Sequence, residues 1–423
     1  MEISDVDLTD PEFFAHHDPH PVFKRMRAED PVHWTRGRLT RGFWSLTRYE
    51  DVQRVFRDAR SYSSERYGTG LPSSAEVERG PAESVPAQER ANGAMLVITD
   101  PPRHDGLRRL FRGPFLPRMI AQMEGRARQI VSEIVDEIAP AGRCDFVLDF
   151  ANRLPMAIIC EMMGIAREDW GKMFRFGNMA LGHEDPEFQV GNAAETQSQG
   201  FRGLSEYCFR LAKVRQQHPG NDLISLIANG AIDGQRLADH EVSFNCLMFV
   251  IAGLETTRNA ISGGVLELIR NPDQLARLIA DRSLMPTAIE EILRWTSPIT
   301  HSLRAALRDS EIRGRKIQQD DWVVLWNASA NRDQEAFVEP ERFDVGRRPN
   351  YHVAFGYGEH FCLGAHLARL EIRLALDEVM RRIPDLQLDG EVQRLSSNLV
   401  AGIKHMPVRF KPGRAAPERA PAL

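Results

Sequence analysis

Apolar residues recur at helical spacing through most of the chain. Positions three and four apart share one face of an α-helix, so repeated apolar positions at that spacing predict a helix. The pattern predicts helices over residues 102–112, 119–138, 154–163, 170–181, 197–217, 223–228, 241–270, 274–282, 287–295 and 363–382. Helical pattern far outweighs strand pattern, so the sequence predicts a mainly α protein with small β-sheets.

Strand-like stretches are short and gather toward the two ends of the chain. Residues 32–34 and 43–46 flank a basic Gly/Thr turn and predict a hairpin. Further short strands are expected at residues 323–326, 386–388 and 406–410.

One long segment, residues 61–91, carries no sustained period and is rich in Ser, Gly, Pro and Glu. A loop of that length inside a compact domain is either disordered or functional, as a lid or a binding segment, and the sequence leaves both interpretations open. No linker separates two domains. We therefore predict one domain over residues 1–423, with flexible ends at 1–10 and 412–423.

Charge and composition exclude several classes of function. The chain has 54 Lys+Arg against 59 Asp+Glu, a net charge of -5, so no global positive field favours nucleic acid. No apolar run approaches the roughly 20 residues that cross a bilayer, and the start lacks the pattern of a signal peptide. We expect a cytoplasmic protein without a membrane span. Five scattered cysteines and no Cys-x-x-Cys pair argue against a disulfide framework or a zinc site.

Cys362 differs from the other four cysteines in its surroundings. It lies in a glycine-punctuated loop, residues 355–364, which runs directly into a predicted helix. The N-terminus of a helix stabilises a thiolate, and glycines let a flat ligand approach the backbone. A packed cysteine beside a turn would be the simpler interpretation of Cys-Leu-Gly alone, but the ten-residue context favours a ligand.

That loop reads Phe355-x-x-Gly358-x-His360-x-Cys362-x-Gly364 and resembles the haem-binding loop of the cytochrome P450 monooxygenases. The resemblance extends over nearly the whole chain and implies the cytochrome P450 fold as a single large domain. It further implies haem b (iron protoporphyrin IX), with Cys362 as the axial thiolate and Phe355 beside the cofactor. The haem would lie between the long central helix and the helix after the cysteine loop.

A second segment, Ala252-Gly253-Leu254-Glu255-Thr256-Thr257, lies within the long helix predicted over 241–270. A mid-helix Gly costs about 1 kcal/mol relative to Ala, which suggests a reason such as close approach of a ligand. An ordinary amphipathic core helix explains the hexapeptide equally well by itself. The segment resembles the oxygen-activation segment of the same family, in which an acid and an alcohol relay protons toward dioxygen. Glu255 and Thr256 would then be catalytic, with Glu255 where many members have Asp.

Two further sets of charged residues match the family by position. Glu291 and Arg294, alone a common surface pair, resemble its Glu-x-x-Arg motif and would form a structural triad with Arg342 behind the cysteine loop. Haem carries two propionates, which need cations or N–H donors when buried. The positions that match the propionate ligands of the family are His104, Arg108, Arg304 and His360, each of which alone would suit a solvated surface.

The expected substrate pocket is mostly apolar, which implies an apolar substrate. By position its walls are Met95, Leu96, Val97, Phe249, Ala252, Ile299, His301 and Leu399. His301 would bind a polar end of the substrate or be an unremarkable half-exposed histidine. Residues 257–262 and 402–406 resemble the bacterial branch that hydroxylates steroid side chains, fatty acids, alkanes and terpenes. We expect a steroid, terpenoid or fatty-acid-like substrate, with a polycyclic or peptide-derived natural product as the alternative.

No Gly-x-Gly-x-x-Gly motif of a flavin or nicotinamide domain occurs, so electrons have to come from outside. The resemblance implies a ferredoxin and its reductase, docking on the cysteine side. Arg109, Arg112 and Arg369 would form a local basic patch there, or simply a solvated helix face. Two rival classes stay open: a peroxide-driven enzyme of the same fold, which would not need Glu255 and Thr256, and a non-catalytic haem- or lipid-binding protein.

Overall fold

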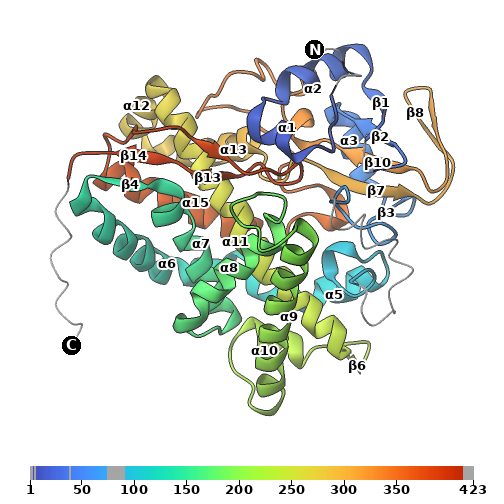
Figure 1. Cartoon of the computed structure of the whole chain (residues 1–423), viewed down its shortest axis with the longest axis horizontal. Coiled ribbons are helices and arrows are strands. Elements are labelled where there is room, and N and C mark those ends of the chain that lie inside the picture. Colours follow the sequence, from blue (N-terminus) through green and yellow to red (C-terminus); the bar gives the residue numbers. More distant parts are fainter. Residues whose placement is uncertain (1–2, 4–5, 38–39, 74–90, 413–423) are drawn as a thin grey trace.

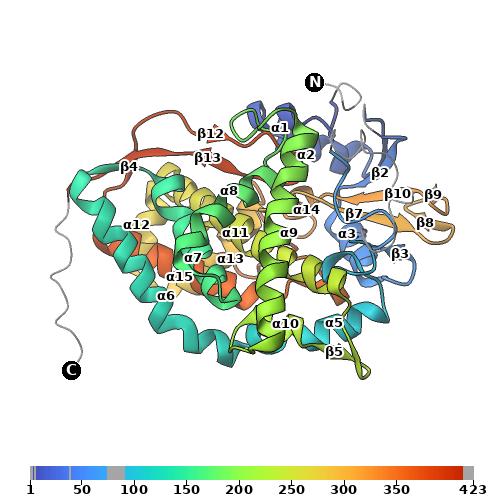
Figure 2. The ribbon, with the colours of Figure 1, turned by 60° about the horizontal axis from the view of Figure 1, so that its bottom comes forward.

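The computed structural model describes residues 3, 6–37, 40–73 and 91–412. Its longest helix, α11 (Asp239–Arg270), crosses the middle of the molecule (Figure 1). Helix α9 (Ala193–Gln217) packs across α11 from one side, as the turned view in Figure 2 shows. The mainly α fold predicted from the sequence is confirmed.

All ten predicted helices are present, and α8 (Trp170–Leu181) and α10 (Leu223–Ala228) begin and end at the predicted residues. The other long helices differ from the predictions by a few residues at either end. They are α5 (Arg103–Phe111), α6 (Pro117–Ile138), α7 (Arg153–Met163), α12 (Pro272–Ala280), α13 (Met285–Thr296) and α15 (Ala365–Arg382). Shorter helices are α1 (Pro11–His16), α2 (His20–Glu29), α3 (Tyr49–Arg57) and α14 (Asn327–Ala330).

A five-stranded sheet lies at one side of the helices (Figure 2). The predicted hairpin is confirmed: β1 (Val32–Thr35) and β2 (Phe43–Leu46) are antiparallel, with Val32 opposite Leu46. The sheet continues through β10 (Trp322–Leu325), β7 (Ser302–Ala306) and β3 (Tyr62–Ser63). Strand β7 was not expected, because its sequence, Ser-Leu-Arg-Ala-Ala, has an arginine at its centre and no run of β-branched residues.

The remaining strands form small sheets. A three-stranded sheet joins β11 (Gln387–Leu388), β14 (Pro407–Arg409) and β4 (Arg143–Asp145). Three two-stranded pairs are β12 (Gln393–Arg394) with β13 (Ile403–His405), β5 (Ala231–Ile232) with β6 (Gln235–Arg236), and β8 (Ser310–Ile312) with β9 (Arg315–Ile317). Most of the predicted loop segment at 74–90, and the tail after 412, lie outside the described residues.

Glycines on α11 bring neighbouring helices close to it. A Cβ at Gly253 would lie 2.6 Å from Cγ1 of Ile159 on α7, and one at Gly264 would lie 2.6 Å from Cγ2 of Ile292 on α13. The expectation that Gly253 makes room for a ligand is therefore wrong. Its small size is needed for helix packing, because any larger residue would collide with α7.

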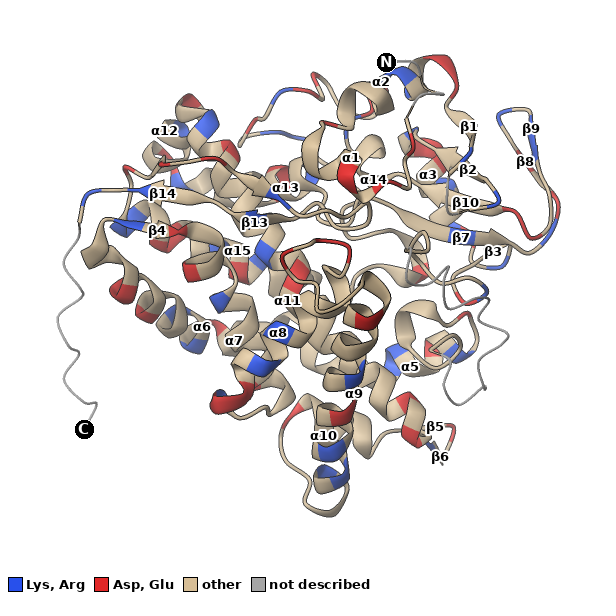
Figure 3. Cartoon of the chain, viewed as in Figure 1, with Lys and Arg blue, Asp and Glu red and all other residues tan. Residues whose placement is uncertain are grey.

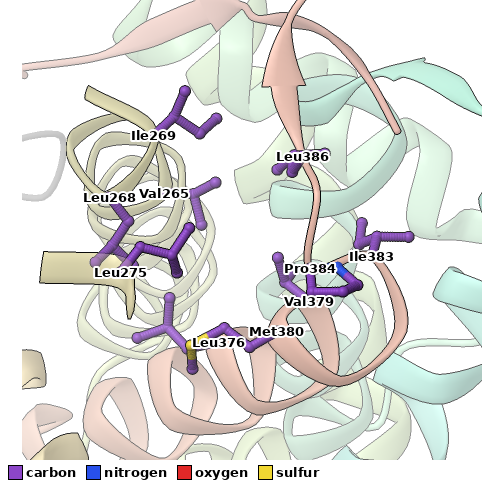
Figure 4. Close-up of a pocket in the computed structure, with 10 residues that line it drawn as sticks. All are labelled: Val265, Leu268, Ile269, Leu275, Leu376, Val379, Met380, Ile383, Pro384 and Leu386. Carbon is purple, nitrogen blue, oxygen red and sulfur yellow. The ribbon is translucent and has the colours of Figure 1, made fainter. Parts of the chain in front are cut away.

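Figure 4 shows one small pocket in the helical core, and Figure 3 shows both charges along the helices. A small apolar pocket between α11, α12 and α15 (Figure 4), lined by residues such as Val265, Leu376 and Ile383, has a volume of about 20 Å³. That volume holds about one water molecule, so the pocket does not serve a substrate. Basic and acidic residues occur together on α6 and α12 (Figure 3). Within the described ranges, none of the helices has the length and apolar character required to cross a bilayer.

Candidate functional site

The loop that carries Cys362 is held by its own backbone. The N–H of Cys362 donates to the carbonyl of Phe355 (2.9 Å), and Gly356 and Gly358 have φ values of +70° and +71°. A Cβ at Gly358 would lie 2.6 Å from the carbonyl oxygen of Phe56. Only glycine satisfies both the left-handed backbone and that close approach. Helix α15 begins at Ala365, with Cys362 just before its first turn.

The surroundings of Cys362 favour negative charge on sulfur through specific groups and oppose it through burial. Burial raises the pKa of the thiol, whereas a hydrogen bond from the N–H of Gly364 and the charges of Arg108 and Arg369 act in the opposite direction. Although protein encloses most of the residue, its side chain keeps accessible surface. Cys362 thus combines accessible surface with donors and positive charges near its sulfur.

Three of the four residues expected to bind propionates come together beside the cysteine loop. His104 of α5 and His360 lie with ring centroids 4.2 Å apart. Arg108, one turn after His104 on α5, donates from Nη2 to the carbonyl of Phe361 (2.7 Å). A cationic group is therefore placed directly over the loop that ends in Cys362.

Arg304 of β7 is the fourth residue of the cluster. Its side chain is buried, donates to the carbonyl of Leu303 (2.7 Å) and lies over the ring of Phe56 at 5.4 Å. Burial lowers the pKa of Arg304 to about 10. Burial also lowers the pKa of His360 to about 2, and the charges of Arg304, His104 and Arg108 add to that shift. The neighbouring arginines thus oppose a positive charge on His360, and Arg108 does the same for His104.

The cluster lacks the anions that normally accompany buried cations. Across the described part of the chain, no carboxylate lies at ion-pair distance from Arg108, Arg304 or His360, and His104 meets only Asp105, at 3.4 Å. The Nε2 atom of His104 is buried without a hydrogen-bond partner. A ligand with two carboxylates beside the sulfur would satisfy this cluster, so the residues fit the propionates of haem.

On α11, the candidate catalytic pair is split between two environments. Thr256 is half-buried and donates from Oγ1 to the carbonyl of Ala252 (3.0 Å). Ala252 is exposed although both neighbouring turns of α11 are largely buried. Accessible space therefore borders the face of α11 that carries Ala252 and Thr256.

Glu255 is 3 % exposed and forms an ion pair with Arg258 on the same helix. Arg258 also donates to Oδ1 of Asn178 on α8 (3.3 Å) and to Oδ1 of Asn259 (3.4 Å). Sequence reasoning missed this partner, although an arginine three residues after a glutamate on one helix is a recognisable signal. The acid is thus held by a buried polar network that reaches α8.

The structural triad differs from the prediction in one member. Arg294 donates to Glu291 through Nε (2.7 Å) and Nη2 (2.8 Å), as expected. The third arginine is Arg347, whose Nε donates to Glu291 (3.0 Å). The side chain of Arg342 is 57 % exposed and pairs with Glu339 instead. Arg342 contributes only its carbonyl, which accepts from both Arg294 and Arg347.

Two residues expected in the substrate pocket have other roles. Phe249 is buried and its ring stacks on Phe115 at 5.4 Å and meets Phe111 edge-on at 5.5 Å, so it packs α11 against α5. His301 is fully buried: its Nε2 accepts from the N–H of Leu71 (3.0 Å), and its Nδ1 lies 3.2 Å from the carbonyl of Asn398. Burial lowers the pKa of His301 to about 4. Both expectations for His301, a substrate contact and a half-exposed histidine, are wrong.

The other expected pocket residues differ in how much surface they expose. Val97 is 41 % exposed, whereas Leu96 is buried and Met95 is partly buried against the core. Ile299 pairs with Val400 in an isolated bridge, and Leu399 is partly accessible beside it. The pocket assignment stays a proposal for these residues and for Ala252.

The expected basic patch is smaller than predicted. Arg109 and Arg112 are exposed. Arg369, however, donates to both oxygens of Glu290 (2.6 and 2.8 Å) and lies over the ring of Phe355 at 4.7 Å. It therefore supports the cysteine loop and is not a free surface charge.

A long central helix, and a cysteine loop with arginines and histidines beside it, together suit a class of protein that would hold an anionic cofactor against a thiolate. The family model "Cytochrome P450" matches residues 205–397. The putative cytochrome P450 126 of Mycobacterium tuberculosis is 36 % identical, over 97 % of this chain and 99 % of its own length. The methyl-branched lipid omega-hydroxylase of Mycobacterium bovis is 37 % identical, over 97 % and 96 %.

A solved structure agrees with these sequence matches. The Mycobacterium marinum cytochrome P450 CYP268A2, in complex with pseudoionone, superposes with a TM-score of 0.88 at 34 % identity and covers 96 % of this chain and 98 % of its own. The chain belongs to the cytochrome P450 family and is a monooxygenase.

Proposed function

We propose that the chain is a haem-thiolate monooxygenase that holds its iron through Cys362 and oxidises an apolar C–H bond. One observation carries the assignment: two arginines without carboxylate partners, Arg108 and Arg304, lie with His104 and His360 beside an exposed cysteine. Haem, when bound, supplies the activation of O2 that permits insertion of one oxygen atom into the substrate.

Each residue around the proposed cofactor has its own role in binding it. Cys362 provides the negative sulfur, and the N–H of Gly364 limits how much charge that sulfur donates. Arg108, Arg304, His104 and His360 bind the propionates, whose negative charges compensate those of the two arginines. Phe355 fixes the loop through its carbonyl and carries Arg369 over its ring.

Thr256 and Glu255 of α11 transfer protons on the side of the site away from Cys362. Because the hydroxyl proton of Thr256 is donated to Ala252, the lone pairs of Oγ1 stay available to accept a hydrogen bond. Glu255 is the adjacent acid, and it has to exchange Arg258 for another partner before it can pass a proton. This acid and alcohol favour O2 as oxidant over the peroxide-driven alternative.

For the substrate, we propose a steroid, terpenoid or fatty-acid-like molecule. Val97, Ile299 and Leu399 offer apolar accessible surface. The similarity to a methyl-branched lipid omega-hydroxylase and to a structure holding pseudoionone supports the same class. A polycyclic or peptide-derived natural product is the alternative, and a spin-state titration with both kinds of ligand separates them.

Electrons are proposed to come from a ferredoxin and its reductase. The exposed Arg109 and Arg112 on the cysteine side suit an acidic partner. Charge reversal in Arg112→Glu should slow reduction at low salt and remove most of its salt dependence. An unchanged rate would exclude Arg112 from docking.

The test of the central assignment is a reduced, carbon monoxide difference spectrum of the purified protein. The wild type should show the long-wavelength band of a thiolate-ligated complex, and Cys362→Ala should lose it. A band of histidine ligation, or no haem, would overturn the assignment. NADPH consumption without oxidation of any apolar ligand would favour the non-catalytic haem- or lipid-binding class.

A further inference from the structure

Asn245 of α11 is a fully buried amide whose contacts leave the helix. Its Oδ1 accepts from the backbone N–H of Leu96 (3.0 Å). Its Nδ2 donates to the carbonyl of Ala94 (2.8 Å) and to the carbonyl of Glu241 one turn earlier (2.8 Å). The Asn245 side chain thus hydrogen-bonds to both a backbone N–H and a backbone carbonyl of a distant segment, residues 94–98.

Asn245 lies on the face of α11 that borders the proposed reaction site. Asn245 and Ala252 are seven residues apart, close to two helical turns, so they point to the same side of the helix. Ala252 in turn accepts the hydroxyl of Thr256. The segment 94–98 is therefore fixed along the same face of α11 as Ala252 and the candidate catalytic Thr256.

Buried and exposed side chains lie next to each other in this segment. Leu96 is 4 % exposed, and Val97, the next residue, is 41 % exposed. Thr99 is buried and donates from Oγ1 to the carbonyl of Met95 (2.8 Å), which stiffens the turn. Small displacements of the backbone would therefore move Met95 and Val97 directly.

Few other polar contacts tie the segment to the rest of the protein. Its remaining backbone hydrogen bonds join nearby residues, such as Gly93 N–H to the carbonyl of Ile98 (2.9 Å). Of the α11 side chains that the structure describes, Asn245 alone hydrogen-bonds to residues 94–98. An apolar residue of similar size at 245 would leave a buried N–H and a buried C=O without partners, so the segment would have to move.

We infer that Asn245 is a positioning residue that sets the distance of Met95 and Val97 from the substrate and thereby the site of oxidation. This inference rests on the proposed function, because it assigns these two side chains to the substrate pocket. Asn245 itself touches neither the cofactor nor the reacting atoms in this assignment. It acts through the backbone that it holds.

The experiment compares the holoenzyme with Asn245→Leu and Asn245→Asp. Dodecanoic, tetradecanoic and hexadecanoic acids and pseudoionone serve as probes, and mass spectrometry measures the ratio of oxidised positions. Asn245→Leu should change that ratio by at least about threefold, with a matching change in the order of ligand affinities from spin-state titration. Asn245→Asp, which keeps the acceptor for Leu96 and loses the donor to Ala94, should give an intermediate change.

Asn271→Leu is the matched control. The amide of Asn271, at the C-terminal end of α11, donates to the carbonyl of Glu267 (2.8 Å) as Asn245 does to Glu241, but it holds no distant segment. Its product ratio should equal that of the wild type.

The outcomes separate the two proposals. Oxidation by the wild type with unchanged product ratios and affinity order in both Asn245 variants would overturn the inference and leave the proposed function intact. Lower thermal stability without a change in ratio would do the same, since it would make Asn245 merely structural. A wild type that forms the thiolate-type complex but binds and oxidises none of the probes would overturn the assignment of the pocket, and the inference with it. If Asn245→Leu does not fold, Asn245→Asp decides.

Discussion

The two sides of the central helix are held together by different interactions. On the cysteine side, charged side chains bond to backbone: Arg294 and Arg347 hold carbonyls of a loop, and Arg108 holds that of Phe361. On the proposed substrate side, one neutral amide, Asn245, holds the segment 94–98, whose one exposed residue, Val97, is apolar. In the proposed function, the first arrangement would hold a cofactor in one geometry. The second would hold one wall of the substrate pocket with few hydrogen bonds, so that this wall could change without loss of the cofactor site.

This contrast explains why chemistry is easier to infer than specificity. The cysteine side depends on charges and glycines, which few other residues can replace. The substrate side depends on shape, and many apolar residues can supply the same shape. The predictions below test the contrast, from the largest expected effect to the smallest.

The largest effect is expected from Arg347→Leu. This change leaves the buried carboxylate of Glu291 with fewer donors and removes one donor from each of three backbone carbonyls, so the free energy of unfolding should fall by about 3–5 kcal/mol. Urea denaturation measures it. Arg342→Leu is the control and should cost less than about 1 kcal/mol, because that side chain is exposed. An equal loss of unfolding free energy in Arg342→Leu and Arg347→Leu would show that Arg342 belongs to the triad after all.

Arg304→Leu should stabilise the protein without haem and weaken the retention of haem in the protein that contains it. Without haem, removal of a buried, unpaired cation should stabilise the chain, since burial already disfavours that charge. With haem, loss of a propionate partner should speed haem release at least about tenfold, which corresponds to about 1.4 kcal/mol. Haem transfer to apomyoglobin and thermal melting of both forms measure the two effects. Stabilisation of both the haem-free and the haem-bound protein by Arg304→Leu would exclude Arg304 from the propionate site.

Thr256→Ala should leave haem binding unchanged and alter coupling. The hydroxyl bonds only within α11, so its loss costs little stability. Peroxide released per NADPH should rise several-fold if the hydroxyl guides protons. Thr257→Ala, which alters the neighbouring hydroxyl, is the control. Equal coupling in the wild type and Thr256→Ala would exclude the catalytic role.

The smallest effect concerns pH, away from the cofactor. Burial opposes a charge on His405, but hydrogen bonds to Asp145 and Glu187 outweigh it and raise its pKa. A raised pKa in the folded state adds stability below the pKa of the unfolded chain, and this stability is lost as pH rises through the folded value. His405→Gln should therefore lower Tm slightly at pH 6 and hardly at pH 9. A larger loss at pH 9 would contradict the assignment.

The sequence predicted the helices and the cysteine loop well because both depend on local pattern. The helical period is a property of each segment, and Cys362 lies in a motif with five fixed positions. The misassigned residues depend on contacts between distant segments. Arg347 lies 56 residues from Glu291, and only the fold decides that it, rather than Arg342, reaches that carboxylate. Likewise, Phe249 and His301 are buried by partners on α5 and near Leu71, which no local pattern reveals.

The network around Glu291 has a consequence for mutational tolerance. Arg294 and Arg347 bind the carbonyls of Val338, Glu339, Pro340 and Arg342, so the loop is recognised through its main chain rather than through its side chains. Val338 is 82 % exposed. Saturation mutagenesis should therefore find positions 338 and 342 permissive and positions 291, 294 and 347 nearly invariant. A segment without regular secondary structure can thus drift in sequence while its path stays fixed.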